Sequence, residues 1–293
     1  MPGYAVIEAP SVLGLFPGGV ETLPETLLHA GLAEAIGARR VGLVAPPSYN
    51  PQRDPTTGLL NPVGLRDYSH QLADATGETL EGGEFPIVLG GDCSILLGNL
   101  LALRRRGCYG LLFLDGHADF YQPEAEPNGE SASMDLALAT GRGPAVVTGI
   151  EGRCPLVRDA DVVVFGRRDF ADAEGHGSQR IEDTAIAMTD LAAVRAAGIE
   201  VAAASAVERL SKSELDGVWI HLDADVLDDA IMPAVDYRIP DGLSWDELAA
   251  VLRAGVGSGR AVGINVTIFN PKLDGGGSIA RAFMEALAQG LKP

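Results

Sequence analysis

The sequence is short of cysteine, of basic residues and of long apolar stretches. Its three cysteines, Cys93, Cys108 and Cys154, form neither a CxxC pair nor an even set, so we expect no disulfide framework and a cytoplasmic location. Lysine and arginine number 22 against 40 acidic residues, giving a net charge of −18, which argues against a nucleic-acid or anionic-membrane partner. No apolar stretch reaches the ~18 residues of a membrane span, and none follows a charged segment as in a secretory leader.

Short apolar runs alternate along the chain with amphipathic stretches, and hydrophobic residues make up 46% of it. The predicted strands are residues 41–44, 85–89, 110–114, 162–165, 218–222 and 262–266. The predicted helices are residues 24–36, 68–79, 94–106, 134–140, 191–197, 205–210, 245–254 and 279–291. This alternation is typical of an α/β fold whose mostly parallel sheet is covered on both faces. Since composition does not shift along the chain, we expect a single domain over residues 1–293.

Two acidic clusters follow two of the predicted strands. They are Asp115-Gly-His117-Ala-Asp119 and Asp223-Ala-Asp225. Residues two apart on an extended chain point to the same side, so each cluster is expected to converge on one point. Carboxylates without partners at the ends of buried strands would be costly, and divalent cations would offset that cost. Carboxylates with one imidazole suit Mn²⁺ or Mg²⁺, and a pair of such ions lowers the pKa of a shared water molecule.

Several further motifs occur in a fixed order around these clusters. They include Gly90-Gly91-Asp92-Cys93-Ser94, Met134-Asp-Leu-Ala137 and Asn270-Pro271. Taken together in this order, the motifs resemble those of the ureohydrolases, the family of arginase, agmatinase and related amidinohydrolases. The resemblance implies a three-layer α/β/α fold with an eight-stranded sheet, a dinuclear Mn²⁺ centre and hydrolysis of a guanidine-type C–N bond. It also implies a small-molecule guanidine substrate and a homo-oligomer, either a trimer or a hexamer.

The resemblance also assigns metal ligands. The matching positions are Asp115, His117, Asp119, Asp223 and Asp225. The sixth ligand of the family is a histidine, and here that position is Cys93. A thiolate suits Zn²⁺ or Fe²⁺ better than Mn²⁺, so a ligating Cys93 predicts that one of the two ions is weakly held or replaced. The alternative, that Cys93 is a small buried residue without metal contact, stays open. His221 is expected to face away from the ions.

Candidate substrate residues surround the predicted metal site. They are Tyr121, Asn128, Glu130, Glu174 and Arg238. The first three stand where the family binds the carboxylate of an amino acid, and Glu174 matches an acid that contacts the substrate's amino group. Arg238 can meet a substrate carboxylate in a bidentate manner, or pair with Asp236 or Asp241 instead.

Two departures from the family concern catalysis. The proton-shuttling histidine is Ala132, and the glutamate that orients the guanidinium is Ile268. Asp119 is the candidate that carries a proton to the departing nitrogen, and Glu130 is a second candidate acid–base, unless it is an exposed loop acid. Because Ile268 removes a charge-assisted contact, we expect a modified guanidine, such as an N-hydroxyguanidine amino acid, rather than plain arginine.

Two other functions remain open. A single-metal amide hydrolase of the deacetylase type would need only one Asp-x-His and one further aspartate, and the presence of Asp119 and Asp225 argues against it. A non-catalytic, metal-containing relative that binds a small molecule would explain Cys93 and Ala132. The five acid and imidazole ligand positions argue against that reading.

Overall fold

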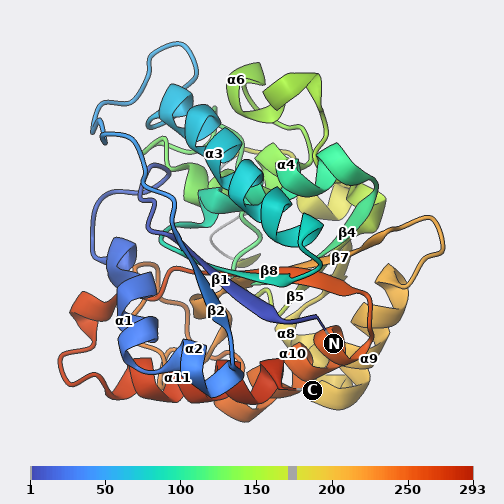
Figure 1. The fold of residues 1–293 in the computed structure, drawn as a ribbon. Coiled ribbons are helices and arrows are strands. Elements are labelled where there is room, and N and C mark those ends of the chain that lie inside the picture. The colour runs from blue at the N-terminus through green and yellow to red at the C-terminus, as the bar shows by residue number, and fades with distance from the viewer. Residues whose placement is uncertain (1, 171–176, 293) are drawn as a thin grey trace.

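The computed structural model describes residues 2–170 and 177–292, and its centre is one sheet of eight parallel strands. The strands are β1 (Tyr4–Ala9), β2 (Arg39–Leu43), β3 (Phe85–Gly90), β4 (Tyr109–Leu114), β5 (Val162–Phe165), β6 (Ala187–Thr189), β7 (Gly217–Asp223) and β8 (Ala261–Thr267). Their order across the sheet is β2-β1-β3-β8-β7-β4-β5-β6 (Figure 1). The predicted parallel sheet is confirmed, with β1 and β6 added to the six strands expected from the sequence.

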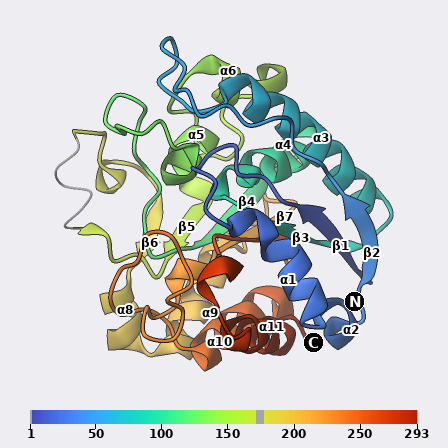
Figure 2. The same ribbon diagram turned by 90° about the vertical axis from the view of Figure 1, so that its left-hand side faces the viewer.

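Helices cover both faces of the sheet (Figures 1 and 2). One face carries α3 (Pro62–Glu81), α4 (Leu96–Arg106), α5 (Asp135–Ala139) and α6 (Ala145–Thr148). The other carries α1 (Leu23–His29), α2 (Leu32–Ile36), α8 (Leu191–Ala197), α9 (Ile199–Leu210), α10 (Trp245–Gly257) and α11 (Ser278–Leu291). Alternate side chains of β7 enter the two cores, because Ile220 and Leu222 belong to one and Trp219 to the other. The three-layer α/β/α arrangement is confirmed.

The four central strands end beside one another, and each end leads into a motif singled out in the sequence. β3 leads to Cys93, β8 to Ile268, β7 ends at Asp223, and β4 is followed by Asp115. Parallel strands place their carboxyl ends at one edge of the sheet, which is where α/β proteins bind ligands. The fold therefore gathers these motifs from distant parts of the sequence.

Strands from the beginning and the end of the chain share this one sheet, since β1 pairs with β3 and β3 with β8. We therefore retain the proposal of one domain over residues 1–293. Among the helices of the described residues, none combines the length and the apolar character needed to cross a membrane.

The chain approaches itself closely at Gly91, where a Cβ atom would lie 1.8 Å from the carbonyl oxygen of Ser11. We predict that Gly91→Ala lowers the free energy of unfolding by about 1–3 kcal/mol, because the backbone must move to admit the methyl group. Gly257, at the end of α10, has nothing within 4 Å of such a Cβ, so Gly257→Ala should leave stability unchanged or raise it by up to ~1 kcal/mol. Urea unfolding compares the two variants, and equal midpoints would contradict this packing.

Candidate metal centre

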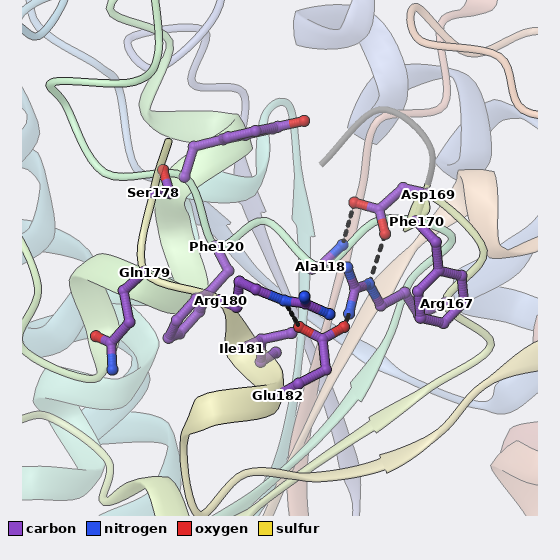
Figure 3. A pocket seen from close by; sticks show the side chains of 11 residues that line it. Ala118, Phe120, Arg167, Asp169, Phe170, Ser178, Gln179, Arg180, Ile181 and Glu182 are labelled. Atoms are coloured by element: carbon purple, nitrogen blue, oxygen red, sulfur yellow. Dashed lines mark hydrogen bonds and ion pairs between the residues drawn. The ribbon is translucent and has the colours of Figure 1, made fainter. Parts of the chain in front are cut away.

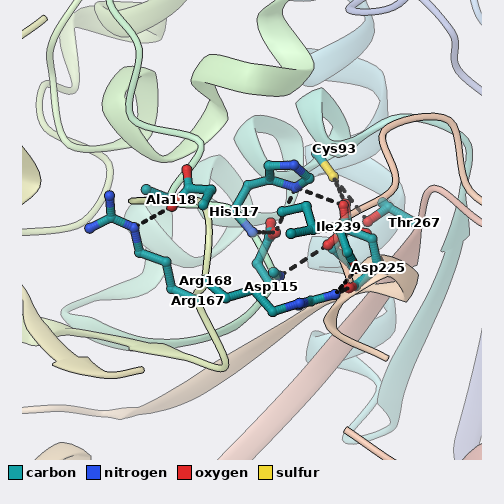
Figure 4. A network of polar contacts seen from close by, with 12 residues as sticks. Cys93, Asp115, His117, Ala118, Arg167, Arg168, Asp225, Ile239 and Thr267 are labelled. Atoms are coloured by element: carbon teal, nitrogen blue, oxygen red, sulfur yellow. Dashed lines mark hydrogen bonds and ion pairs between the residues drawn. The ribbon is translucent and has the colours of Figure 1, made fainter. Parts of the chain in front are cut away.

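The two acidic clusters meet at the edge of the sheet and hold one another in place (Figure 4). The Nδ1 atom of His117 lies 2.8 Å from Oδ2 of Asp225, and the amide of Gly116 donates to Oδ1 of Asp225 at 3.0 Å. Asp115 and Asp223 stand at the ends of β4 and β7, which are paired neighbours. The structure thus brings together the residues that the sequence grouped as two clusters.

We expected each cluster to lie on an extended backbone, but in the structure the backbone turns within both clusters. Residues Ala224–Val226 form a 3-10 turn, and Asp119 has a left-handed φ of 43°. The carboxylates themselves fold the chain, since Oδ1 of Asp115 accepts from the amide of His117 at 2.6 Å and Oδ1 of Asp223 accepts from the amide of Asp225 at 2.7 Å. Aspartates often bind the backbone two residues on, which turns the chain.

Among the described residues, Asp119 and Asp223 form no ion pair with a basic side chain, and Asp115 has the Nδ1 atom of His117 at 3.8 Å from its Oδ1. Burial, followed by the charges of neighbouring carboxylates, raises the pKa of Asp115, Asp119 and Asp223 well above the usual range. Asp225 differs: burial opposes its ionisation, but His117 and Arg168 lower its pKa. Oδ2 of Asp115 is buried and has no hydrogen-bond partner in the described part of the chain. An orphaned carboxylate oxygen among uncompensated acids fits a hard divalent cation.

Cys93 lies within this cluster as a satisfied thiol. Its Sγ atom is 2.9 Å from Oδ2 of Asp223 and 3.2 Å from Oγ1 of Thr267. The thiol donates its one proton to Oδ2 of Asp223, and the Thr267 hydroxyl donates its own proton to the carbonyl of Leu222 at 3.1 Å. Burial, and then the charge of Asp223, raises the pKa of Cys93. The ligand role of Cys93 stays a prediction.

The expectation that His221 faces away from the cluster is wrong. A ring nitrogen of His221 lies within 4.8 Å of ligand atoms of Cys93, Asp115 and Asp223. Residues 221 and 223 are two apart on β7 and therefore share a face of the sheet. The imidazole is fully buried and stacks on Phe113, with ring centroids 4.5 Å apart.

A hydrogen-bond chain fixes which nitrogen of His221 carries the proton. The indole of Trp219 donates to Oδ1 of Asn265 at 2.7 Å, so the amide nitrogen of Asn265 faces Nδ1 of His221, also at 2.7 Å. An amide nitrogen only donates, so Nδ1 accepts and the proton of the neutral ring is on Nε2. Burial lowers the pKa of His221 to about 3, which keeps the ring neutral. His221 therefore presents an N–H group, not a lone pair, from Nε2.

A second set of ion pairs braces the first acidic cluster from outside (Figure 3). Nε of Arg167 lies 2.5 Å from Oδ1 of Asp169, and its NH1 lies 2.7 Å from Oε1 of Glu182. The other oxygen of Asp169 accepts from the amide of Ala118 at 3.1 Å. Arg167 lines the small pocket shown in Figure 3. Its ion pair with Asp169 orients the carboxylate that binds the amide of Ala118, which supports the segment that carries His117.

A cavity of about 250 Å³ opens over the cluster. Its floor includes His117, Asp119, Asp223 and Asp225, and its walls include Tyr121, Asn128, Glu130, Ala132, Tyr237 and Ile268. Three of the five candidate substrate residues thus line one cavity above the candidate metal ligands. This is the arrangement that a small-molecule active site requires.

The other two candidate substrate residues do not join this wall. Arg238 is not among the cavity's lining residues; it forms a surface ion pair with Asp229, whose Oδ2 lies 3.0 Å from its NH2. The pairing with Asp236 or Asp241 that we considered is wrong, because the ion pair of Arg238 is with Asp229, and Asp236 accepts from the side chain of Asn270 instead. Glu174 lies outside the described residues.

Glu130 is buried rather than an exposed loop acid, since only 3% of it is accessible to solvent. The Tyr237 hydroxyl donates to its Oε2 at 2.6 Å, and the amide of Phe16 donates to Oε1 at 3.4 Å. Sequence reasoning missed Tyr237 and chose its neighbour Arg238. The signal was available, because Tyr237 follows the second acidic cluster in the same loop and its ring is long enough to span the cavity wall.

Comparison with known proteins agrees with this geometry. The model of the arginase family matches residues 22–291. The chain belongs to the arginase family. It is 29% identical over 250 residues to the arginase of Staphylococcus aureus (strain COL), and the match covers 83% of this chain and 81% of the relative.

Solved structures of the arginase family share the fold. The arginase of Bacillus caldovelox superposes with a TM-score of 0.90 at 24% identity, covering 100% of this chain and 99% of that one. The proclavaminate amidino hydrolase of Streptomyces clavuligerus superposes with a TM-score of 0.73 at 20% identity, covering 99% and 91%. At these identities the likeness is one of fold.

This arginase-family chain carries backbone strain in its cavity. Ile268 has a φ of 70° and Asp119 a φ of 43°, and both line the cavity. A left-handed conformation is unfavourable for a β-branched residue, and such strain concentrates at functional sites. The amide of Ile268 donates to the carbonyl of Gly91 at 2.8 Å, which helps to hold the strained turn.

We predict that Mn²⁺ stabilises the protein and that chelation reverses the effect. At a hundredfold excess over Kd, binding should add about 2.7 kcal/mol to the free energy of unfolding. For a chain of 293 residues that is about 4 °C in Tm. Asp223→Asn should lose most of this shift, whereas Asp74→Asn, which alters an exposed pair with Arg105, should keep it. A shift of equal size in both variants would show that the ions bind elsewhere.

Proposed function

We propose that this arginase-family hydrolase cleaves the C–N bond of a modified guanidine with the help of two divalent cations. The observation that carries the proposal is the cavity of about 250 Å³ whose floor consists of the two acidic clusters. A substrate in this cavity would meet the candidate metal ligands from above while polar side chains contact its other end.

The residues that would hold the cations are Asp115, His117, Asp119, Asp223 and Asp225, with Cys93 as a sixth candidate. When bound, two Mn²⁺ ions supply a water nucleophile at neutral pH by lowering its pKa. The orphaned Oδ2 of Asp115 and the uncompensated charge of Asp119 and Asp223 support this role.

Two acids have proposed roles in moving protons. Asp119 lies at the cavity floor and would pass a proton to the nitrogen that departs as the C–N bond breaks. Glu130, oriented by Tyr237, would act as a second acid–base group or pair with a cationic part of the substrate. Tyr121 and Asn128 on the adjoining wall would orient the polar end of the substrate.

The walls of the cavity support a modified guanidine over plain arginine. Ile268 offers no charge to a guanidinium, and Ala132 offers no proton carrier. An N-hydroxyguanidine has a lower pKa than an alkylguanidine and is more often neutral, so it depends less on a paired acid. Arginine is the competing substrate, since several relatives are arginases by name.

The remaining expectations from the sequence stay predictions. They are the identity of the ions as Mn²⁺, the homo-oligomeric state as trimer or hexamer, and the cytoplasmic location.

We predict that the purified protein with Mn²⁺ releases urea or hydroxyurea from a guanidine, and faster from N-hydroxyarginine than from arginine. Colorimetric detection of both products measures the rates, with Asp223→Asn as the inactive control. If no guanidine reacts with Mn²⁺, Co²⁺, Fe²⁺ or Zn²⁺, the proposed reaction is wrong. Activity on acetylated amines with one ion per chain would favour the single-metal amide hydrolase instead.

A second prediction concerns Ile268. Ile268→Glu should raise kcat/KM for arginine relative to N-hydroxyarginine by about 10- to 100-fold, because a charge-assisted contact contributes about 1.5–3 kcal/mol. Ile268→Leu removes the β-branch without adding charge, so the ratio of the two kcat/KM values should not change. A glutamate variant with the wild-type ratio would show that this wall does not select the substrate.

A further inference from the structure

One buried acid near the metal centre has no part in the proposed reaction. Asp135 is the first residue of α5 and is 0% exposed. Neither of its carboxylate oxygens has a hydrogen-bond partner among residues 2–170 and 177–292. Elsewhere the chain satisfies such a group: buried Asp161 accepts from Lys212 at 3.0 Å and from Arg158. An unsatisfied buried carboxylate requires a positive partner or a proton.

Asp135 faces the acidic cluster. One of its oxygens lies within 4.8 Å of a carboxylate oxygen of Asp119 and of the sulfur of Cys93. Two buried carboxylates that face one another at this distance are an arrangement that a divalent cation can bridge or neutralise.

In the family a histidine is the sixth metal ligand, and in this chain Cys93 stands at that position. Another side chain near the centre could therefore serve as the sixth ligand. The Cys93 thiol donates its one proton to Oδ2 of Asp223, and Oγ1 of Thr267 lies 3.2 Å from the sulfur. His221 presents an N–H group from Nε2, because Asn265 occupies Nδ1. Nε2 of His221 therefore offers no lone pair, and the sulfur of Cys93 is a soft donor atom, whereas the two oxygens of Asp135 are hard donor atoms without a hydrogen-bond partner in the described part of the chain.

We infer that Asp135 is a metal ligand alongside Asp119 and that it replaces the side chain at position 93 in that role. The inference rests on the proposed function, since it concerns the same metal centre. A carboxylate is a harder ligand than a thiolate and suits Mn²⁺ or Mg²⁺. The centre then needs no thiolate, and Cys93 serves as a hydrogen-bond donor to Asp223.

The first test measures bound metal per chain after loading with Mn²⁺ and removal of the excess. Asp135→Asn should halve the bound Mn²⁺, whereas Cys93→Ala should keep it. Asp161→Asn is the matched control, because it removes a buried charge away from the centre, and it should also keep the wild-type amount. Loss of metal in Cys93→Ala with full retention in Asp135→Asn would overturn the inference.

The second test measures the absorption spectrum of the wild-type protein. Co²⁺ bound by a thiolate gives an intense sulfur-to-metal charge-transfer absorption in the near ultraviolet, and carboxylate ligation does not. The Co²⁺-loaded wild-type protein should lack this band, and a band that disappears in Cys93→Ala would assign the ligand to sulfur. If the wild type binds no metal, the proposed function fails together with the inference. If it binds metal and releases urea while Asp135→Asn keeps its full metal content, only the inference about Asp135 fails.

Discussion

The structure depends on carboxylates buried at the ends of two neighbouring central strands. β4 and β7 are paired neighbours and place Asp115 and Asp223 close together, and both side chains are buried. His117 and Arg168 lower the pKa of Asp225. Burial, and then the charges of neighbouring carboxylates, raises the pKa of Asp115 and Asp223, so a bound cation would stabilise their charged forms. Without a bound cation, the burial of these carboxylates would lower the free energy of unfolding.

The surrounding contacts serve to keep these acids in one arrangement. Arg168 binds the carbonyls of Asp225, Leu227 and Ile239 and so fixes the second turn. Asp169 holds the amide of Ala118 in the first. Such outer contacts orient the groups that meet a ligand, and their rigidity keeps the distances between those groups constant. The centre is therefore prepared by the protein before any ion or substrate arrives.

The acidic clusters could be predicted because each follows directly on an apolar run, so a local pattern carries both the strand and its chemistry. β6 could not, since it is a three-residue edge strand that depends on pairing with β5. Asp135 could not be predicted from the local sequence either, because only the packing of α5 brings it to the centre. The position of His221 could have been predicted, because it is two residues from Asp223 on β7 and therefore shares the same face of the sheet.

The ligand set and the substrate are linked through charge. Four aspartates, Asp115, Asp119, Asp223 and Asp225, balance the four positive charges of two divalent ions. A histidine at position 93 would leave that balance unchanged, whereas a ligating thiolate there, or Asp135 as the ligand that we propose, would add one negative charge. Extra negative charge weakens the ions as Lewis acids, so the pKa of their water falls less and the nucleophile is poorer at neutral pH. A centre of this kind favours a guanidine that is more easily attacked, and a neutral one gains from an apolar wall at Ile268. With Asp135 as the proposed ligand, the acid added near the ions and the acid absent from the wall would both favour the modified guanidine that we propose.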